Sequence, residues 1–311
     1  MSVGVFALVL FVAVLHVVWN AVLKSSGDAL RTAERAQVVA VFFFAPPVLI
    51  AWFAIGRPAI PVEALGLGVV SGLLEAAYFI LLSAAYKRGD LSVVYPIARG
   101  TAPLLSVAAG VLILGERLGT EGTIGVAALL IGILLVQQPW RAIALVRRQM
   151  RRSPADPRGR VVDSIGAAEF ALMTGVTIAS YSAVDRVAAR LVEPWLYGAV
   201  VFPICALVLV AWVRLVADRR LEPGAPRPEP ASWTRAGAAG VMSLGAYGLI
   251  LVAYTLAPLS AIAPLRESAV VIASAWGAIR LREAVTSTDR ARRIGGAVLV
   301  LAGAVLLALE G

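Results

Sequence analysis

Hydrophobic residues along this chain fall into ten long runs, which short polar or charged segments separate. A run of about 18 or more predominantly apolar residues can cross a bilayer as a helix. The pattern therefore predicts an all-α polytopic membrane protein whose ten transmembrane helices span 3–23, 36–55, 64–86, 91–114, 121–138, 164–185, 194–216, 234–255, 258–280 and 290–309. The junction between the eighth and ninth helices carries no charge. We place it at Pro258, because proline does not continue a helix.

Two longer polar segments interrupt this pattern. The first, at 139–163, is rich in arginine and divides the chain into halves of five helices each, at 1–138 and 164–311. We interpret these halves as two domains joined by a basic cytoplasmic linker. The second, at 218–233, contains four prolines and is predicted to lack regular structure.

The composition agrees with a membrane protein. Hydrophobic residues make up 60% of the 311 residues and charged residues only 15%, whereas a soluble protein has about 25% charged residues. The chain has one cysteine, Cys205, and one histidine, His16, so the sequence predicts no disulfide, no metal site and no cofactor. The net charge of +9 comes from arginines in short loops rather than along one face, so we expect no nucleic-acid partner.

The distribution of lysine and arginine predicts the orientation. The loops after helices 1, 3, 5, 7 and 9 hold 22 of these residues, and the loops on the opposite side hold four, which are Arg57, Arg117, Arg186 and Arg190. Short basic loops remain in the cytoplasm. Both termini are therefore predicted to be periplasmic, in a bacterial inner membrane.

The two halves share an internal repeat. In the first half, positions 85–96 read Ala-Tyr, four residues, Leu-Ser, three residues and Pro, and positions 253–264 repeat this pattern at the same spacing. An arginine follows each proline, and the fifth and tenth helices both contain two glycines seven positions apart, at 125/132 and 296/303. A weaker match joins 19–22 to 181–184.

A repeat of five helices is odd-numbered, so the second copy must be inverted in the membrane relative to the first. Inverted repeats are typical of secondary transporters, which bind their substrate near the bilayer midplane at the repeat interface. This repeat is the strongest functional signal in the sequence, although it does not identify the cargo.

With these motifs, the chain resembles the ten-helix EamA-like branch of the drug/metabolite transporter superfamily. The segments 16–24, 89–100, 115–118 and 264–268 carry the resemblance, which covers nearly the whole chain. It implies two five-helix domains and the export of amino acids or other small metabolites, as in bacterial members of the YddG kind. The second copy departs from the family in having Arg282-Glu283 where a Gly-Glu pair is usual.

Polar residues deep within the predicted helices are candidates for the substrate site, because such groups are costly in lipid and usually face a cavity. We expect six of them to converge on one cavity, where a carboxylate, two guanidinium groups and tyrosines would suit an amino acid: Glu75, Tyr78, Tyr95, Arg99, Tyr247 and Arg266. Secondary candidates are His16, Asn20, Tyr181, Glu267 and Trp276. Two alternatives remain open. Glu75 could be the structural partner of an arginine, and each arginine could lock its own helix.

Other residues are assigned mechanical roles. Pro96 and Pro264 occupy equivalent positions in helices 4 and 9, and we expect both to act as hinges. Glu116 lies near a helix end and is predicted to cap a helix or form a gate. Leu129 is predicted to face lipid.

Together these patterns favour a monomeric secondary transporter that exports amino acids or related small metabolites by alternating access in the lipid bilayer. We expect no catalytic residues, because a single histidine allows no His-Asp cluster. The alternatives are a passive channel or facilitator and an intramembrane enzyme.

Overall fold

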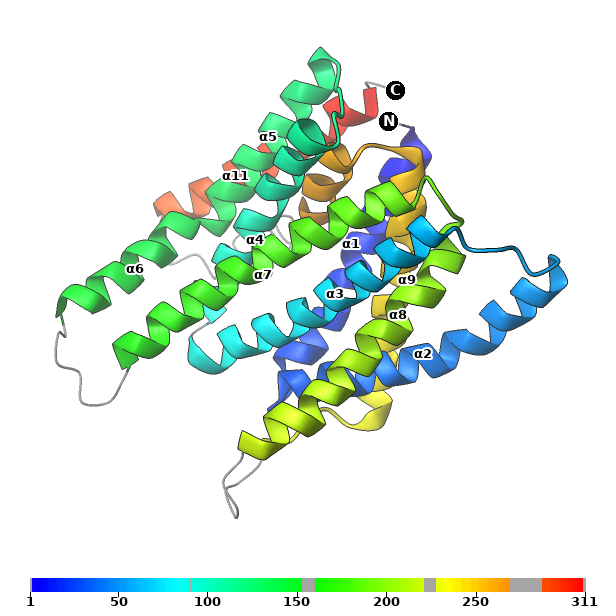
Figure 1. Ribbon diagram of the computed structural model, residues 1–311. Helices are drawn as coiled ribbons and strands as arrows, with labels where there is room; N and C mark the ends of the chain where they lie inside the picture. The colour runs from blue at the N-terminus through cyan, green and yellow to red at the C-terminus, as the bar shows by residue number, and fades with distance from the viewer. Residues whose placement is uncertain (1, 90, 153–159, 221–227, 269–286, 310–311) are drawn as a thin grey trace. The chain divides into compact units, whose positions relative to one another are not determined.

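The computed structural model describes residues 2–89, 91–152, 160–220, 228–268 and 287–309. In this part of the chain all regular structure is helical (Figure 1). The α-helices are α1 (Val3–Lys24), α2 (Ala29–Ala54), α3 (Val62–Arg88), α4 (Leu91–Ala108), α5 (Thr120–Gln137), α6 (Pro139–Arg152), α7 (Arg160–Ala188), α8 (Pro194–Trp212), α9 (Trp233–Leu256) and α11 (Ser287–Leu309). Helical π-turns extend α4 over Ala109–Ile113 and α8 over Val213–Ala217, and residues 259–268 form a further helix.

Nine helices among the described residues are long and apolar enough to cross a membrane. They match nine of the ten predicted spans. The remaining span, predicted at 258–280, is helical over 259–268, and the rest of it lies outside the described residues. Pro258 separates this helix from α9 as predicted.

The predicted start of the second helix, at 36, is wrong by seven residues, because α2 begins at Ala29. Asp28 caps this helix, since its side chain accepts a hydrogen bond of 3.1 Å from the backbone N–H of Arg31. The charged residues before position 36 suggested a loop, but they form the first turns of α2, which Asp28 caps.

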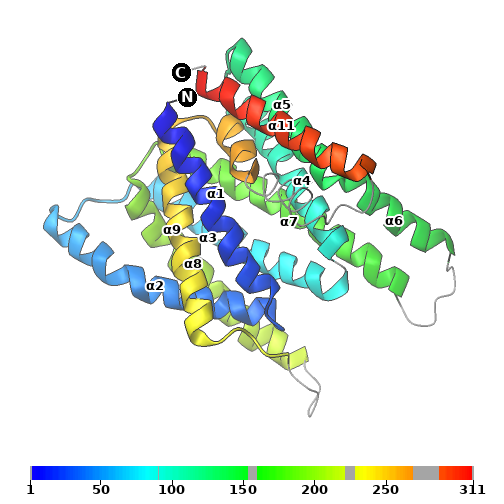
Figure 2. The same cartoon turned by 180° about the vertical axis from the view of Figure 1, so that it is seen from behind.

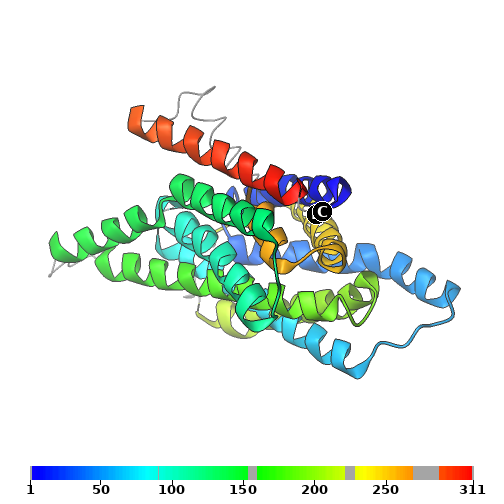
Figure 3. The ribbon, with the colours of Figure 1, turned by 90° about the horizontal axis from the view of Figure 1, so that it is seen from above.

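The basic segment after the fifth helix contains regular structure that the sequence did not predict. Gln138 adopts a left-handed conformation with φ of 48°, and α6 follows α5 directly, with a bend between the two helices (Figures 1 and 3). In the proline-rich segment, Asp218–Arg220 forms one 3₁₀ turn and residues 228–232 lack regular structure, as predicted.

The chain divides into two compact units. The first unit comprises residues 1–13, 81–183 and 256–311, and the second unit comprises 14–80 and 184–255. Each unit combines segments from both sequence repeats.

In the first unit, α5 and α11 pack along each other through the paired glycines (Figures 1 and 2). A methyl group on Gly125 would lie 2.8 Å from the carbonyl oxygen of Gly303, and one on Gly132 would lie 2.6 Å from that of Gly296. Position 125 therefore meets 303 while 132 meets 296, so the two helices are antiparallel. In the repeat, Gly125 corresponds to Gly296 and Gly132 to Gly303. Each glycine thus contacts the counterpart of the other, as residues related by a two-fold axis do. This contact pattern confirms the inverted relationship for this helix pair.

Leu129 lies in this contact and is fully buried, so its predicted exposure to lipid is wrong. Its backbone nitrogen would lie 2.9 Å from a methyl group on Gly303. The apolar pattern of α5 does not distinguish its two faces, because both are hydrophobic. The lipid-exposed positions of this helix include Ile124 and Ile131.

The second unit shows the same exchange of partners. A methyl group on Gly72 of α3 would lie 2.7 Å from the carbonyl oxygen of Val201 in α8, and one on Gly240 of α9 would overlap the carbonyl oxygen of Ala36 in α2. Positions 72 and 240 are 168 residues apart, as are 85 and 253 in the repeat motif. Equivalent glycines thus allow close packing of α3 on α8 and of α9 on α2.

Candidate substrate site

The six predicted substrate-site residues are divided equally between the two units. Glu75, Tyr78 and Tyr247 belong to the second unit, and Tyr95, Arg99 and Arg266 belong to the first. Their convergence on one cavity stays a prediction, and we describe each set by itself.

A buried carboxylate that the sequence analysis missed organises the second unit. Asp185 of α7 is fully buried, and three hydroxyl groups from three other helices donate hydrogen bonds to it. Ser71 and Tyr197 bond to Oδ1 at 2.5 and 2.9 Å, and Tyr247 bonds to Oδ2 at 2.6 Å. The oxygens of Ser71 and Tyr247 are 3.2 Å apart. We call these four residues the Asp185 network.

Glu75 lies beside the Asp185 network. It is buried one turn after Ser71 on α3, and its carboxylate interacts electrostatically with the side chains of Tyr197, Tyr247 and Cys205. The second unit thus contains two buried carboxylates, which both interact with Tyr197 and Tyr247. A buried carboxylate is costly unless hydrogen bonds or a cation compensate it, so this region suits a positively charged group.

Tyr78 and Tyr247 have different surroundings. Tyr247 bonds to Asp185 and also packs edge-on against Phe202, with ring centroids 5.2 Å apart. Tyr78 is buried and its ring contacts that of Phe79 at 4.9 Å. Of the six predicted residues, Tyr247 is thus a member of the Asp185 network itself.

The repeat gives a reason to regard the Asp185 network as functional. The offset of 168 residues relates Ser71 to Ala239 and Tyr247 to Phe79, and the match of 19–22 with 181–184 relates Asp185 to Leu23. These three polar residues thus have apolar counterparts in the other repeat, whereas Glu75 corresponds to Ser243 at the same offset. Helix packing alone does not require this polar group, since the fold forms without it at the equivalent positions. This comparison could have identified Asp185 from the sequence.

In the first unit, Arg99 and Glu267 form a buried ion pair, with Nη1 and Oε1 3.2 Å apart. Arg266 lies nearby, with its Nε 3.7 Å from the same oxygen. The Arg99 guanidinium also lies 6.0 Å from the ring centroid of Tyr95. These contacts favour the interpretation in which Arg99 locks helices together, because removal of one partner of a buried pair leaves the other charge uncompensated.

The ion pair joins equivalent positions of the two repeats. Arg99 follows Pro96 by three residues, and Glu267 follows Pro264 by three. Opposite charges at these positions allow α4 and the 259–268 helix to meet where two identical charges would repel.

Glu116 is a helix cap, as predicted. Its carboxylate accepts hydrogen bonds from the backbone N–H groups of Leu259 and Ser260 at 2.8 and 2.9 Å, and from the Ser260 hydroxyl at 2.9 Å. A carboxylate at a helix N-terminus stabilises it through these bonds and the helix dipole. The capped helix belongs to the opposite repeat.

The predicted hinge prolines lie inside helices. Pro96 is within α4, and Pro264 is within the 259–268 helix. α4 ends in the π-helical turn at Ala109–Ile113, a feature that often marks functional sites.

The secondary candidates have local partners. In α1, Trp19 donates to Nδ1 of His16 at 3.2 Å, and the Asn20 amide donates to the His16 carbonyl at 2.8 Å. Tyr181 is buried in α7, and Glu267 pairs with Arg99. Trp276 lies outside the described residues.

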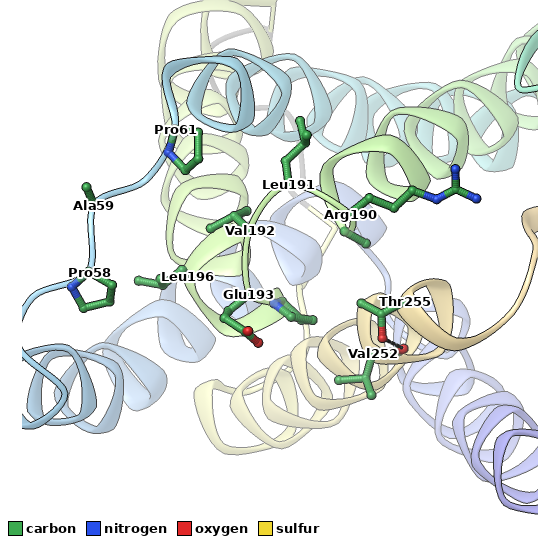
Figure 4. A pocket seen from close by; sticks show the side chains of 12 residues that line it. Pro58, Ala59, Pro61, Arg190, Leu191, Val192, Glu193, Leu196, Val252 and Thr255 are labelled. Atoms are coloured by element: carbon green, nitrogen blue, oxygen red, sulfur yellow. Dashed lines mark hydrogen bonds between the residues drawn. The ribbon is translucent and has the colours of Figure 1, made fainter.

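The second unit also contains two adjoining cavities. The loop cavity, of about 600 Å³, is lined by the α2–α3 loop, the α7–α8 loop and the end of α9 (Figure 4). The apolar groove, of about 720 Å³, lies between α1, α2, α8 and α9. Glu193, Pro194 and Val252 line both cavities, so the two spaces adjoin. Among the described residues, no group of His, Cys, Asp and Glu side chains could hold a metal ion.

The EamA-like transporter family matches residues 3–137 and 167–309 of this chain. These two stretches correspond to the two predicted repeats. A crystal structure aligns with 99% of this chain and 97% of its own at a TM-score of 0.65 and 17% identity, which shows a shared fold.

Similarity to individual proteins is shorter. The chain is 39% identical over 70 residues to the spermidine export protein MdtI of Citrobacter koseri, and 40% identical over 70 residues to the protein of that name from Shigella flexneri. Each match covers 22% of this chain and 64% of the relative.

Proposed function

Because the chain belongs to the EamA-like transporter family, we propose that it is a secondary carrier that exports small metabolites bearing an ammonium group, namely amino acids or related amines. The observation that carries this proposal is the Asp185 network, in which three hydroxyl groups surround a fully buried carboxylate with Glu75 nearby.

The chemistry of this network supports an ammonium ligand. An ammonium group donates three hydrogen bonds and carries a compensating charge. It could replace the hydroxyl donors around Asp185 and interact with Glu75 as well. The hydroxyl groups hydrogen-bond the carboxylate when no cargo is bound. The empty carrier thus avoids a bare buried charge, which would hinder its change of conformation.

The similar proteins agree with this chemistry. Spermidine, after which the similar export proteins are named, and an amino acid share the ammonium group. Amino acids add a carboxylate, which spermidine lacks. Cargo with and without a carboxylate therefore distinguishes the two substrate classes.

The test is counterflow in proteoliposomes. Vesicles loaded with one unlabelled compound are offered the same compound in labelled form, across a panel of amino acids, spermidine and their deaminated analogues. A carrier gives transient, saturable accumulation of amine-bearing compounds. Linear, unsaturable flux would indicate a passive channel, and equal counterflow of the deaminated analogues would contradict recognition of the ammonium group.

A further inference from the structure

The apolar groove of the second unit lies at membrane depth. Its walls come from the segments of α2, α8 and α9 that are apolar enough to span the bilayer. The α2 wall presents Val41, Phe44, Ala45, Val48 and Leu49, which are spaced along one helical face. Leu49 is exposed, and so is the neighbouring Phe43, so this wall continues onto the lipid-facing surface.

Small residues form the floor of the groove on α9. A methyl group on Gly245 or Gly248 would meet no atom within 4 Å, so the space beside α9 is open. The α9 lining runs from Leu244 to Val252, a rise of about 12 Å. Water is a poor occupant of an apolar space of this size. A hydrocarbon chain from the bilayer would bury its surface there at no polar cost.

At one end, the groove adjoins the loop cavity, whose lining carries opposite charges. The α7–α8 loop contributes Arg190 and Glu193, and Figure 4 shows Glu193 directed towards Val252 and Thr255 while Arg190 extends away from it. Within the described part of the chain, neither charged side chain has an ion-pair or hydrogen-bond partner. Arginine suits phosphate, and a carboxylate suits a primary ammonium.

We propose that these two cavities together bind a zwitterionic phospholipid with a primary amine, of the phosphatidylethanolamine type. One acyl chain fills the apolar groove, the phosphate contacts Arg190 and the ammonium contacts Glu193. The two cavities follow the same order as the headgroup and acyl chain of a lipid. The charged loop lies beyond the ends of the membrane-spanning helices, and the groove lies between these helices. Phosphatidylglycerol lacks a cationic group for Glu193, and a choline lipid lacks N–H donors.

The test measures lipid retention and lipid-dependent stability of the full-length protein. Native mass spectrometry detects lipid that co-purifies in mild detergent, and thermal unfolding is followed after addition of dioleoyl phosphatidylethanolamine, phosphatidylcholine or phosphatidylglycerol. We expect retained phosphatidylethanolamine and the largest stabilisation with that lipid. Equal stabilisation by all three lipids would overturn the proposal.

Variants identify the site. Gly248→Leu fills the groove and should abolish both lipid retention and selective stabilisation. Gly66→Leu, at an exposed glycine of α3 that also has open space around it, should preserve them. Glu193→Gln should remove the preference for phosphatidylethanolamine over phosphatidylcholine. Arg190→Gln should weaken binding of every phospholipid about tenfold.

Two results would contradict this assignment. The first is unchanged phosphatidylethanolamine binding in Gly248→Leu. The second is stabilisation of the wild type by free leucine that Gly248→Leu abolishes, which would make the groove a cargo site instead.

Discussion

Asp185 and Leu23 occupy matching positions in the two repeats, yet one is a hydrogen-bonded carboxylate and the other an apolar side chain. The same contrast separates Tyr247 from Phe79. Both repeats form the same fold, so the fold does not require a side chain that is present at only one of two equivalent positions. At the residue scale, the repeat therefore separates candidate functional groups from packing groups.

Leu129 is a packing residue, and its substitution tests the observed α5–α11 contact. Leu129→Ala removes buried side-chain atoms at the glycine-lined contact, so we expect a loss of about 3 kcal/mol in unfolding free energy. Ile131→Ala, on the exposed side of the same helix, should change it by less than about 0.5 kcal/mol. Thermal unfolding in one detergent compares the two variants, and equal losses would contradict the observed packing.

At the scale of elements, helix ends are held by residues distant in sequence. Glu116 caps the 259–268 helix. The backbone N–H of Ala231, just before α9, donates to the Thr32 hydroxyl of α2 at 2.9 Å, and Arg35 donates to the Ala231 carbonyl at 2.8 Å. These contacts join segments from opposite repeats.

The cap predicts coupled stability effects. Glu116→Gln and Ser260→Ala should each lower the unfolding free energy by about 1 kcal/mol. Their combined effect should be smaller than the sum, because they remove parts of one interaction. Glu121→Gln, at an exposed acid in the first turn of α5, is the matched control. Strict additivity in thermal unfolding would argue against the cap.

The proline helices carry the conformational prediction. We expect Pro96→Ala and Pro264→Ala to slow transport without loss of folded protein, because each restores a backbone hydrogen bond and stiffens its helix. Transport rates in proteoliposomes and thermal unfolding are measured on the same preparations. Pro47→Ala, at an exposed proline within α2, serves as the control. If transport is unchanged when both prolines are replaced by alanine, the prolines do not act as hinges and serve only assembly.

The transmembrane helices could be predicted because a helix that crosses the bilayer needs a long apolar run, and such runs are visible in the sequence. The start of α2 could not be placed by hydropathy, since Arg31, Glu34 and Arg35 are polar residues in a helix whose signal was the Asp28 cap. Asp185 was missed because it lies at a predicted span end, next to Arg186. Helix α6 was missed because arginines dominate its sequence and hydropathy does not report amphipathic helices.

At the scale of the whole molecule, topology remains the main prediction. Arg186 is buried within α7 and donates to the carbonyl of Tyr254, so it is not a loop residue as counted. The direction of the charge bias does not depend on Arg186. We propose the repeats as domains 1–138 and 164–311, with both termini in the periplasm.

Fusions test this orientation. Alkaline phosphatase at the C-terminus should be active, because the enzyme folds only outside the cytoplasm, whereas a fusion in the 153–159 segment should be inactive. The two sites serve as controls for each other. An inactive C-terminal fusion together with fluorescence of a fluorescent protein fused at that terminus would contradict the assignment.

In the proposed function, Asp185 takes part in recognising an ammonium-bearing cargo. The most direct measurement is counterflow by wild type, Asp185→Asn and Glu169→Gln, which changes an exposed carboxylate on the same helix. We expect saturable counterflow of an amine-bearing compound by the wild type and by Glu169→Gln. We expect at least about tenfold weaker counterflow by folded Asp185→Asn, because a charge-assisted hydrogen bond is lost. Equal counterflow by all three proteins would contradict this role of Asp185.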